Sequence, residues 1–386
     1  MKFSILKFQA PPLATFSSSL DFCFNQLTKL ENNLRSNQHI IKISLFAACS
    51  DNGDYRIKKR QMTIAAECIS ECDAPLSLIS QPPLDKKITL EIWMLDQVPE
   101  GTVFTYKSIE DGSSLTIESG LFTLLISTQQ CNQHVQYKEN VQETFEQLDQ
   151  TLSREGFKYG DIVRQWNYIE NITLTEADSV THRQNYQVFN DYRTLYYQKS
   201  EFPNGYPAAT GIGIENGGCL IDIMALKTKV VNHVIPIGNS LQIDAHDYTE
   251  NVLIGKVIEE IKQLSTPKFE RAKFVNTVID GFFYISGTAS ILGEKTVFED
   301  DIKNQTLTAL RNISHLISDK NLTHYHVLSK STPHLSSYRV YIKNENDYPV
   351  VKEICDNYLG INTGVFVKAG ICRSNLLVEI EATYLA

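Results

Sequence analysis

The chain has 386 residues, of which 42% are hydrophobic and 21% charged, a composition typical of a globular protein large enough for two domains. Its net charge is −9, from 36 basic and 45 acidic side chains, and no basic run offsets this excess. This balance argues against nucleic-acid binding, and it means that an anionic ligand would need a local basic pocket.

The first hundred residues contain apolar runs that predict strands over 40–49, 60–68 and 88–95. Pro11 and Pro12 interrupt any apolar segment of a signal peptide. No apolar run approaches the roughly 20 residues that span a bilayer, and the eight cysteines are scattered. We therefore expect a cytoplasmic protein with reduced thiols and no membrane association.

The rest of the chain contains one order of elements twice, as expected of a duplicated unit. The first copy is a strand over 120–127, a helix over 140–155, a strand over 162–172, a helix over 183–197 and a strand ending at 226. The second copy is a strand over 281–290, a helix over 301–316, a strand over 338–343, a helix over 348–358 and strands over 363–368 and 376–382. A polar-faced helix is also predicted over 250–265.

This repetition predicts an α+β fold of two similar units, each a mixed β-sheet with helices packed on one face. We expect the first domain to span residues 1–229, including the strands of the first hundred residues. The second domain should span residues 230–386 and contain the closing strand.

The closing strand carries two glutamates on one face. Period-two alternation places Glu379 and Glu381 beside Leu377. A carboxyl group buried among apolar neighbours has a raised pKa, although a solvated strand face is the simpler reading of this pattern. Cys372 lies seven residues before Glu379, so the two side chains can share a site only across a turn or bulge.

Arginine is the usual ligand of carboxylates, because its guanidinium group forms paired hydrogen bonds with them. Most single arginines nevertheless lie at the surface. The candidates here are Arg164, Arg193, Arg271, Arg339 and Arg373. Arg193 is favoured, because it follows an aromatic-rich helix that includes Tyr186. Gly287 marks a place where the backbone approaches another group closely, by default a packing contact.

Motifs for cofactors are absent. Cys68 and Cys72 have no second pair, and His324 and His326 have no third ligand nearby, so neither predicts a metal site. The Gly211-x-Gly213 pair is not a dinucleotide fingerprint. We therefore predict no metal and no organic cofactor.

Six segments together resemble the chorismatase family, whose members carry two YjgF/RidA-like units in one chain. They are RQWNYI (164–169), YQVFNDYR (186–193), PAATGIG (207–213), KFERA (268–272), ISGTAS (285–290) and CRSNLLVEIE (372–381). The resemblance covers residues from about 120 to the end. One departure is NSLQ at 239–242, where the family has Asn-Pro-Arg-Gln.

The resemblance implies a role for each matching position. Glu379 matches the catalytic acid, and Cys372 and Gly287 match positions that vary between subgroups with different products. Tyr186, Arg193, Tyr248 and Arg271 match substrate-binding residues. The cysteine–glycine pair resembles the subgroup that makes 3-hydroxybenzoate. Arg373 lies near the position of a carboxylate-binding arginine in RidA-like proteins, and we include it in the substrate site.

The implied reaction is the release of pyruvate from chorismate, after protonation of its enol-ether methylene carbon, in secondary metabolism. Alternatives are a mixture of 3- and 4-hydroxybenzoate, hydrolysis to a dihydroxycyclohexadiene carboxylate, a RidA-like imine deaminase, or a non-catalytic carboxylate-binding module. The sequence leaves the oligomeric state open between monomer and trimer.

Overall fold

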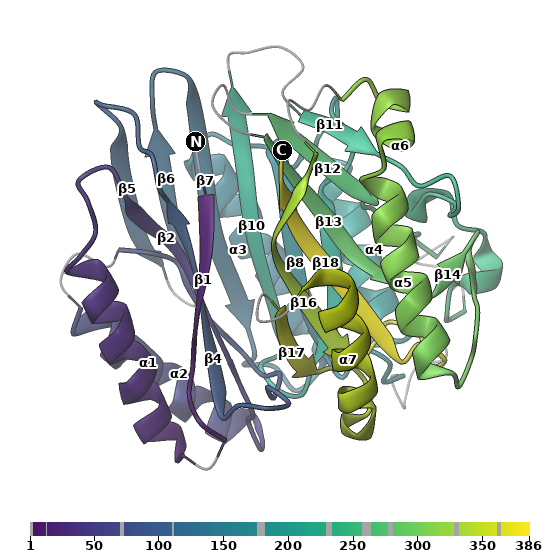
Figure 1. Ribbon diagram of the computed structural model, residues 1–386, viewed down its shortest axis with the longest axis horizontal. Coiled ribbons are helices and arrows are strands. Elements are labelled where there is room, and N and C mark those ends of the chain that lie inside the picture. The colour runs from purple at the N-terminus through teal and green to yellow at the C-terminus, as the bar shows by residue number, and fades with distance from the viewer. Residues whose placement is uncertain are drawn as a thin grey trace.

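The computed structural model describes residues 3–12, 14–69, 73–109, 112–175, 182–228, 234–256, 264–276, 281–327, 332–360 and 364–386. These residues form three mixed sheets with their helices, together with a small two-stranded sheet (Figure 1). None of the helices in these ranges is long and apolar enough to span a bilayer.

The N-terminal sheet is built from the first 95 residues. Its strands, in spatial order, are β1 (Phe3–Gln9), β4 (Ile88–Leu95), β2 (His39–Ala47) and β3 (Leu76–Ile79). Only β2 and β3 are parallel. Helices α1 (Phe16–Glu31) and α2 (Asn52–Glu67) pack their apolar side chains on one face of it.

The second sheet contains the first copy of the repeated unit. Its spatial order is β5 (Val103–Ile109), β6 (Gly112–Glu118), β7 (Phe122–Cys131), β10 (Cys219–Thr228), β8 (Ile162–Glu170) and β9 (Ala208–Ile214). Helices α3 (Tyr137–Arg154) and α4 (Asn185–Tyr197) cover one face, where Phe145 and Phe189 meet. A 3-10 turn, η1 (Tyr159–Asp161), precedes β8.

The third sheet repeats this topology. Its order is β11 (Val234–Ile237), β12 (Ala272–Asn276), β13 (Gly281–Ala289), β18 (Val378–Leu385), β16 (His334–Ile342) and β17 (Gly364–Lys368). Helices α5 (Ile302–Leu316) and α7 (Tyr348–Leu359) pack on one face (Figure 1). In both units the last two strands of the spatial order are parallel and the other pairs antiparallel. The remaining elements are β14 (Ile291–Leu292), β15 (Lys295–Thr296), α6 (Asp319–His324), η2 (Ala245–Asp247), η3 (Glu250–Val252) and η4 (Glu345–Asp347).

The helix-free faces of the three sheets meet in a common core. Trp93 of the N-terminal sheet packs edge-on against Trp166 of the second sheet. Tyr284 and Tyr341 of the third sheet belong to the same cluster. The predicted α+β class, with two repeated units and helices on one face of each, is confirmed.

One predicted element is wrong, and a second is tested only in part. The predicted strand over 60–68 lies in helix α2, whose start is set by the Asp51 side chain accepting a hydrogen bond from the Asp54 amide. Of the predicted helix over 250–265, residues 250–256 form the 3-10 turn η3 and irregular backbone instead, whereas 257–263 lie outside the described residues. The division at 229/230 also lies outside them and stays a prediction.

Candidate active site

A pocket lies where the second and third sheets meet. Residues from both repeated units line it. They are Gln184, Tyr186, Gln187, Asn190, Ala209, Gly211, Tyr248, Val252, Leu253, Ile254, Pro267, Phe269, Arg271, Gly287, Ala289, Ile291, Cys372, Arg373 and Glu379. Of the eight residues that the resemblance assigned to the site, seven line this pocket and Arg193 does not.

Glu379 is the carboxyl group of this pocket. It lies on β18 in the centre of the third sheet and is only 4% exposed. Among the described residues, no side chain or amide donates a hydrogen bond to it, and no cation pairs with it. Burial, and then the negative charge of Glu381, raise the pKa of Glu379 to about 8, although Arg164 and Arg271 oppose this. Glu379 is therefore predominantly protonated at neutral pH.

Gly287 lies directly beneath the Glu379 carboxyl group. A Cβ atom at this position would lie 1.9 Å from Glu379 Oε1 and 3.1 Å from Thr210 Cγ2. The register shift in β13 between Ile285 and Thr288 places Gly287 opposite β18 at this point. Only glycine leaves room for the carboxyl group in its observed place.

Glu381, two residues along the same face, has the opposite environment. It accepts hydrogen bonds from Arg164 Nη2 at 2.7 Å, Trp166 Nε1 at 2.8 Å and Thr210 Oγ1 at 2.5 Å. Arg339 Nη1 lies 3.3 Å from Glu381 Oε1, the oxygen that also accepts from Trp166. Glu381 is thus surrounded by hydrogen-bond donors, whereas Glu379 faces the pocket without a donor among the described residues.

Arg271 supplies positive charge to the pocket. Its Nη2 donates to the Tyr248 hydroxyl at 2.7 Å and to the Ile243 carbonyl at 2.5 Å. Its guanidinium group also lies over the rings of Tyr248 and Phe269. Among the described residues, the buried Nε of Arg271 has no hydrogen-bond partner, so this arginine retains donor capacity for an anion.

Cys372 and Arg373 reach the pocket from the turn between β17 and β18, closed by the Leu376 amide bonding to the Arg373 carbonyl. This turn overcomes the odd spacing between Cys372 and Glu379. Burial raises the pKa of the Cys372 thiol to about 12, so the group is neutral. Arg373 donates to the Glu294 carbonyl and lies over the Tyr248 ring.

Arg193 lies behind the pocket wall rather than in it. It is 2% exposed, and its Nη2 donates to Asn190 Oδ1 at 2.6 Å. Within the described part of the chain, its Nε has no hydrogen-bond partner, and neither has Nδ2 of Asn190, a residue that does line the pocket. Arg193 therefore orients Asn190, and its role as a substrate-binding residue stays a prediction.

Sequence reasoning missed Asn190 and the adjacent Gln187, both of which line the pocket from α4. The signal was present in segment 186–193, since Asn190 follows Tyr186 by four residues and Gln187 by three, spacings that place Asn190 beside both on the helix surface. Arg164 and Arg339 were candidate substrate arginines, but each forms a buried ion pair with a glutamate of the chain.

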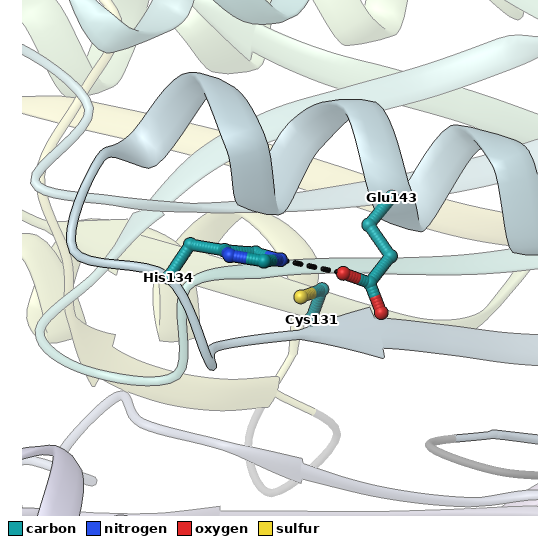
Figure 2. Close-up of side chains that lie close together, drawn as sticks. All are labelled: Cys131, His134 and Glu143. Carbon is teal, nitrogen blue, oxygen red and sulfur yellow. Dashed lines mark hydrogen bonds and ion pairs between the residues drawn. The ribbon is translucent and has the colours of Figure 1, made fainter.

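Among the described residues, two other clusters carry side chains that could bind a metal ion, and one of them consists of Asp244, His246 and Asp247 in and beside the turn η2. In the other, Cys131, at the end of β7, lies near His134 and near Glu143 of α3 (Figure 2). The three groups are already satisfied by the protein, since His134 Nε2 lies 2.6 Å from Glu143 Oε2 and Cys131 donates to Asn140 Oδ1. We assign no metal role to them.

Comparison with known proteins finds similarity to chorismatases. Residues 106–225 match the family described as chorismatase FkbO/Hyg5-like, N-terminal. A 3-hydroxybenzoate synthase of Streptomyces hygroscopicus is 30% identical over 241 residues, which cover 60% of this chain and 65% of that protein. A chorismatase of the same organism is 31% identical over 233 residues, 58% of this chain and 61% of the relative.

A solved structure supports the same relationship at the level of the fold. The crystal structure of a chorismatase aligns with a TM-score of 0.71 at 20% identity, over 100% of this chain and 99% of the other. The curated sequence matches span less than two thirds of each relative's length. The similarity to chorismatases inferred from the sequence motifs is confirmed.

Proposed function

We propose that the protein is a chorismatase that releases pyruvate from chorismate, with Glu379 as the proton donor. One observation carries this proposal. A buried carboxyl group with a pKa of about 8 faces a pocket that also holds an arginine with unused donor capacity. The names of the similar proteins supply the substrate.

The acid step requires a donor that is still protonated near pH 7. Proton transfer to the enol-ether methylene carbon is difficult, because carbon is a weak base, and a carboxylic acid of raised pKa is suited to it. Glu379 meets this requirement through burial and the adjacent charge of Glu381. Protonation leaves a cation-like centre at the ether carbon, which the carboxylate form of Glu379 then faces.

The substrate is a dianion, and the acidic chain must bind it locally. Arg271 offers its free Nε, and Arg373 lies on the same wall near Tyr248. Two guanidinium groups can each hold one carboxylate. The apolar side of the pocket, including Phe269, Ala289 and Ile291, suits the ring of the substrate.

For the product we propose 3-hydroxybenzoate. Intramolecular cleavage converts chorismate to a hydroxybenzoate and pyruvate with no net water, whereas attack by water gives a dihydroxycyclohexadiene carboxylate and pyruvate. The cysteine and glycine at 372 and 287 support the first route, as does the similarity to a 3-hydroxybenzoate synthase. A neutral thiol at Cys372 can exclude water from the ring.

The decisive experiment incubates the purified protein with chorismate. Pyruvate is followed with lactate dehydrogenase and NADH, and the ring product is identified by chromatography against 3-hydroxybenzoate, 4-hydroxybenzoate and dihydrodiol standards. We expect pyruvate and 3-hydroxybenzoate in equal amounts, and at least a thousandfold loss of rate in Glu379→Gln.

Two results would contradict the proposal. Pyruvate release at a near-normal rate by Glu379→Gln would remove this residue from the chemistry. Failure of the folded wild-type protein to convert chorismate, together with ammonia release from 2-iminopropionate, would favour an imine deaminase that uses Arg373.

A further inference from the structure

We infer that Glu91, in the N-terminal sheet, is a positioning residue that acts through Arg339 and Glu381 to keep Glu379 protonated. This inference rests on the proposed function, since Glu379 is the proposed acid. It assigns a role in the active site to the first 95 residues, which contribute none of the side chains that line the pocket.

Glu91 and Arg339 form a buried pair between two sheets. Glu91 lies on β4 and is 1% exposed, and Arg339 on β16 is 2% exposed. Arg339 Nη2 lies 2.5 Å from Glu91 Oε1, and its Nε donates to Oε2 at 3.2 Å. Trp93 Nε1 donates to Glu91 at 2.9 Å. Two paired hydrogen bonds fix the plane of the guanidinium group.

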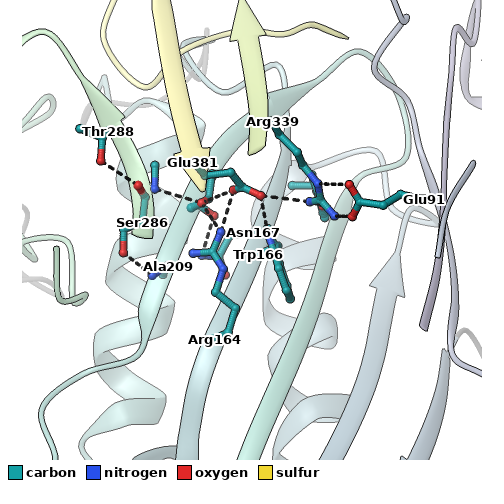
Figure 3. A network of polar contacts seen from close by, with 12 residues as sticks. Glu91, Arg164, Trp166, Asn167, Ala209, Ser286, Thr288, Arg339 and Glu381 are labelled. Carbon is teal, nitrogen blue, oxygen red and sulfur yellow. Dashed lines mark hydrogen bonds and ion pairs between the residues drawn. The ribbon is translucent and has the colours of Figure 1, made fainter. Parts of the chain in front are cut away.

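The third nitrogen of Arg339 turns toward the active-site strand. Its Nη1 lies 3.3 Å from Glu381 Oε1 and donates to the Tyr168 hydroxyl at 2.9 Å. Figure 3 shows the resulting line of groups, from Glu91 through Arg339 to Glu381 and on to Arg164. Glu381 is thus shared between two arginines, of which Glu91 largely neutralises one.

Glu381 is linked to Glu379 by charge and by position. Its negative charge is the largest raising influence on Glu379 after burial. It also accepts a hydrogen bond from Thr210 Oγ1, and that same oxygen accepts the Gly287 N–H at 3.1 Å. Gly287 lies beneath the Glu379 carboxyl group. A change in the charge or position of Glu381 should therefore affect Glu379 in two ways, through the electrostatic potential and through the backbone of Gly287.

The charge balance gives the direction of the effect. With Glu91 ionised, Arg339 is compensated and Glu381 keeps most of its negative potential at Glu379. If Glu91 were neutral, the whole charge of Arg339 would act on Glu381, and Glu379 would ionise at lower pH. Burial makes this coupling stronger than it would be in water.

Other titratable groups face the same layer and must be considered. Burial lowers the pKa of Lys7, on β1, to about 8, and Glu91 and Arg339 both act on it. Lys42 of β2 pairs with Asp222 of β10 at 2.6 Å. The Tyr341 hydroxyl is neutral, because burial raises its pKa. Lys7 and Lys42 partly offset the charge of Glu91, so the expected effect is moderate.

The test is a titration of Glu379 itself in Glu91→Gln. Infrared difference spectra report the carbonyl stretch of the protonated acid, assigned by its loss in Glu379→Gln, and they need no turnover. We expect the midpoint of this band to fall by about one pH unit in Glu91→Gln, together with a roughly fivefold loss of kcat/KM at pH 8 and little loss at pH 6. Glu91→Asp keeps the charge and should retain the wild-type midpoint.

Two further variants make the result interpretable. Arg339→Gln leaves Glu381 less compensated, so it should move the midpoint to higher pH, opposite to Glu91→Gln. Glu155→Gln is the matched control, because it removes an ion pair with Lys107 that lies outside this network. Thermal unfolding checks that each variant is folded.

An unchanged midpoint in both folded Glu91→Gln and Arg339→Gln would overturn the inference. A shift of the same sign in both variants would do so too, since it would indicate general loosening of the core. A wild-type protein that does not convert chorismate but shows the opposite shifts would refute the proposed function while leaving the coupling in place.

Discussion

Replacing Glu379 with glutamine should stabilise the protein increasingly as the pH rises. The wild-type carboxyl group has a pKa of about 8 in the fold against 4.5 for an unperturbed glutamate. Its contribution to stability is therefore complete below about pH 4.5 and is lost as the pH rises through 8, because the unfolded chain releases the proton first. Glutamine is neutral at every pH and keeps that contribution.

The magnitude follows from the proton difference between the two states. Between these two pKa values the folded state holds one more proton than the unfolded chain, which corresponds to about 1.4 kcal/mol per pH unit. From pH 5 to pH 7, the stability of Glu379→Gln relative to wild type should thus increase by about 3 kcal/mol. The glutamine variant gains stability where it loses activity.

Urea unfolding at pH 5, 6 and 7 measures this difference. Trp93 and Trp166 are both buried in the core between the sheets, so their fluorescence reports unfolding. Glu353→Gln, at an exposed position of α7, is the control and should show no such trend. A stability difference between Glu379→Gln and wild type that stays constant from pH 5 to pH 7 would refute a raised pKa for Glu379.

Three further outcomes are expected. Gly287→Ala should reduce kcat at least a hundredfold, because the added Cβ would lie 1.9 Å from Glu379 Oε1. Gly120→Ala, with open space around the new Cβ, should leave kcat unchanged, and equal kcat values in the two variants would contradict this prediction. Arg271→Ala should raise KM about tenfold to a hundredfold, the loss of one charge-assisted contact, and an unchanged KM would exclude it from substrate binding. In wild type, kcat/KM should fall tenfold per pH unit above about pH 8, when Glu379 loses its proton, and a rise there would indicate a base instead.

The sequence predicted the repeated unit well, because its helices have clear apolar periodicity and strong packing faces. Val141, Phe145 and Leu148 of α3 all point into the core under the second sheet. The prediction of a strand over 60–68 fails because helix α2 buries only Tyr55 and Met62 and so has almost no apolar stripe. The clearest sequence signal for this helix is its N-terminal capping residue, Asp51, which lies before that segment.

The candidate site was predictable only in part. Strand alternation placed Glu379 and Glu381 on one face, and the structure confirms that they share it. Strand alternation does not indicate whether the other repeated unit covers this face. That burial depends on contacts such as the one between Arg164 and Glu381, which are more than 200 residues apart in the chain. Cys372 and Glu379 can share a site only if the chain turns between them, and the structure contains this turn.

The position of β18 has a consequence for biosynthesis. This strand is made after β13, β16 and β17, yet it lies between β13 and β16 in the sheet. Until it inserts, the earlier strands have no partner that joins them, and such long-range pairing is slow. Because β18 carries Glu379, a nascent chain acquires its acid only in the step that closes the third sheet, so no partially folded form should be active.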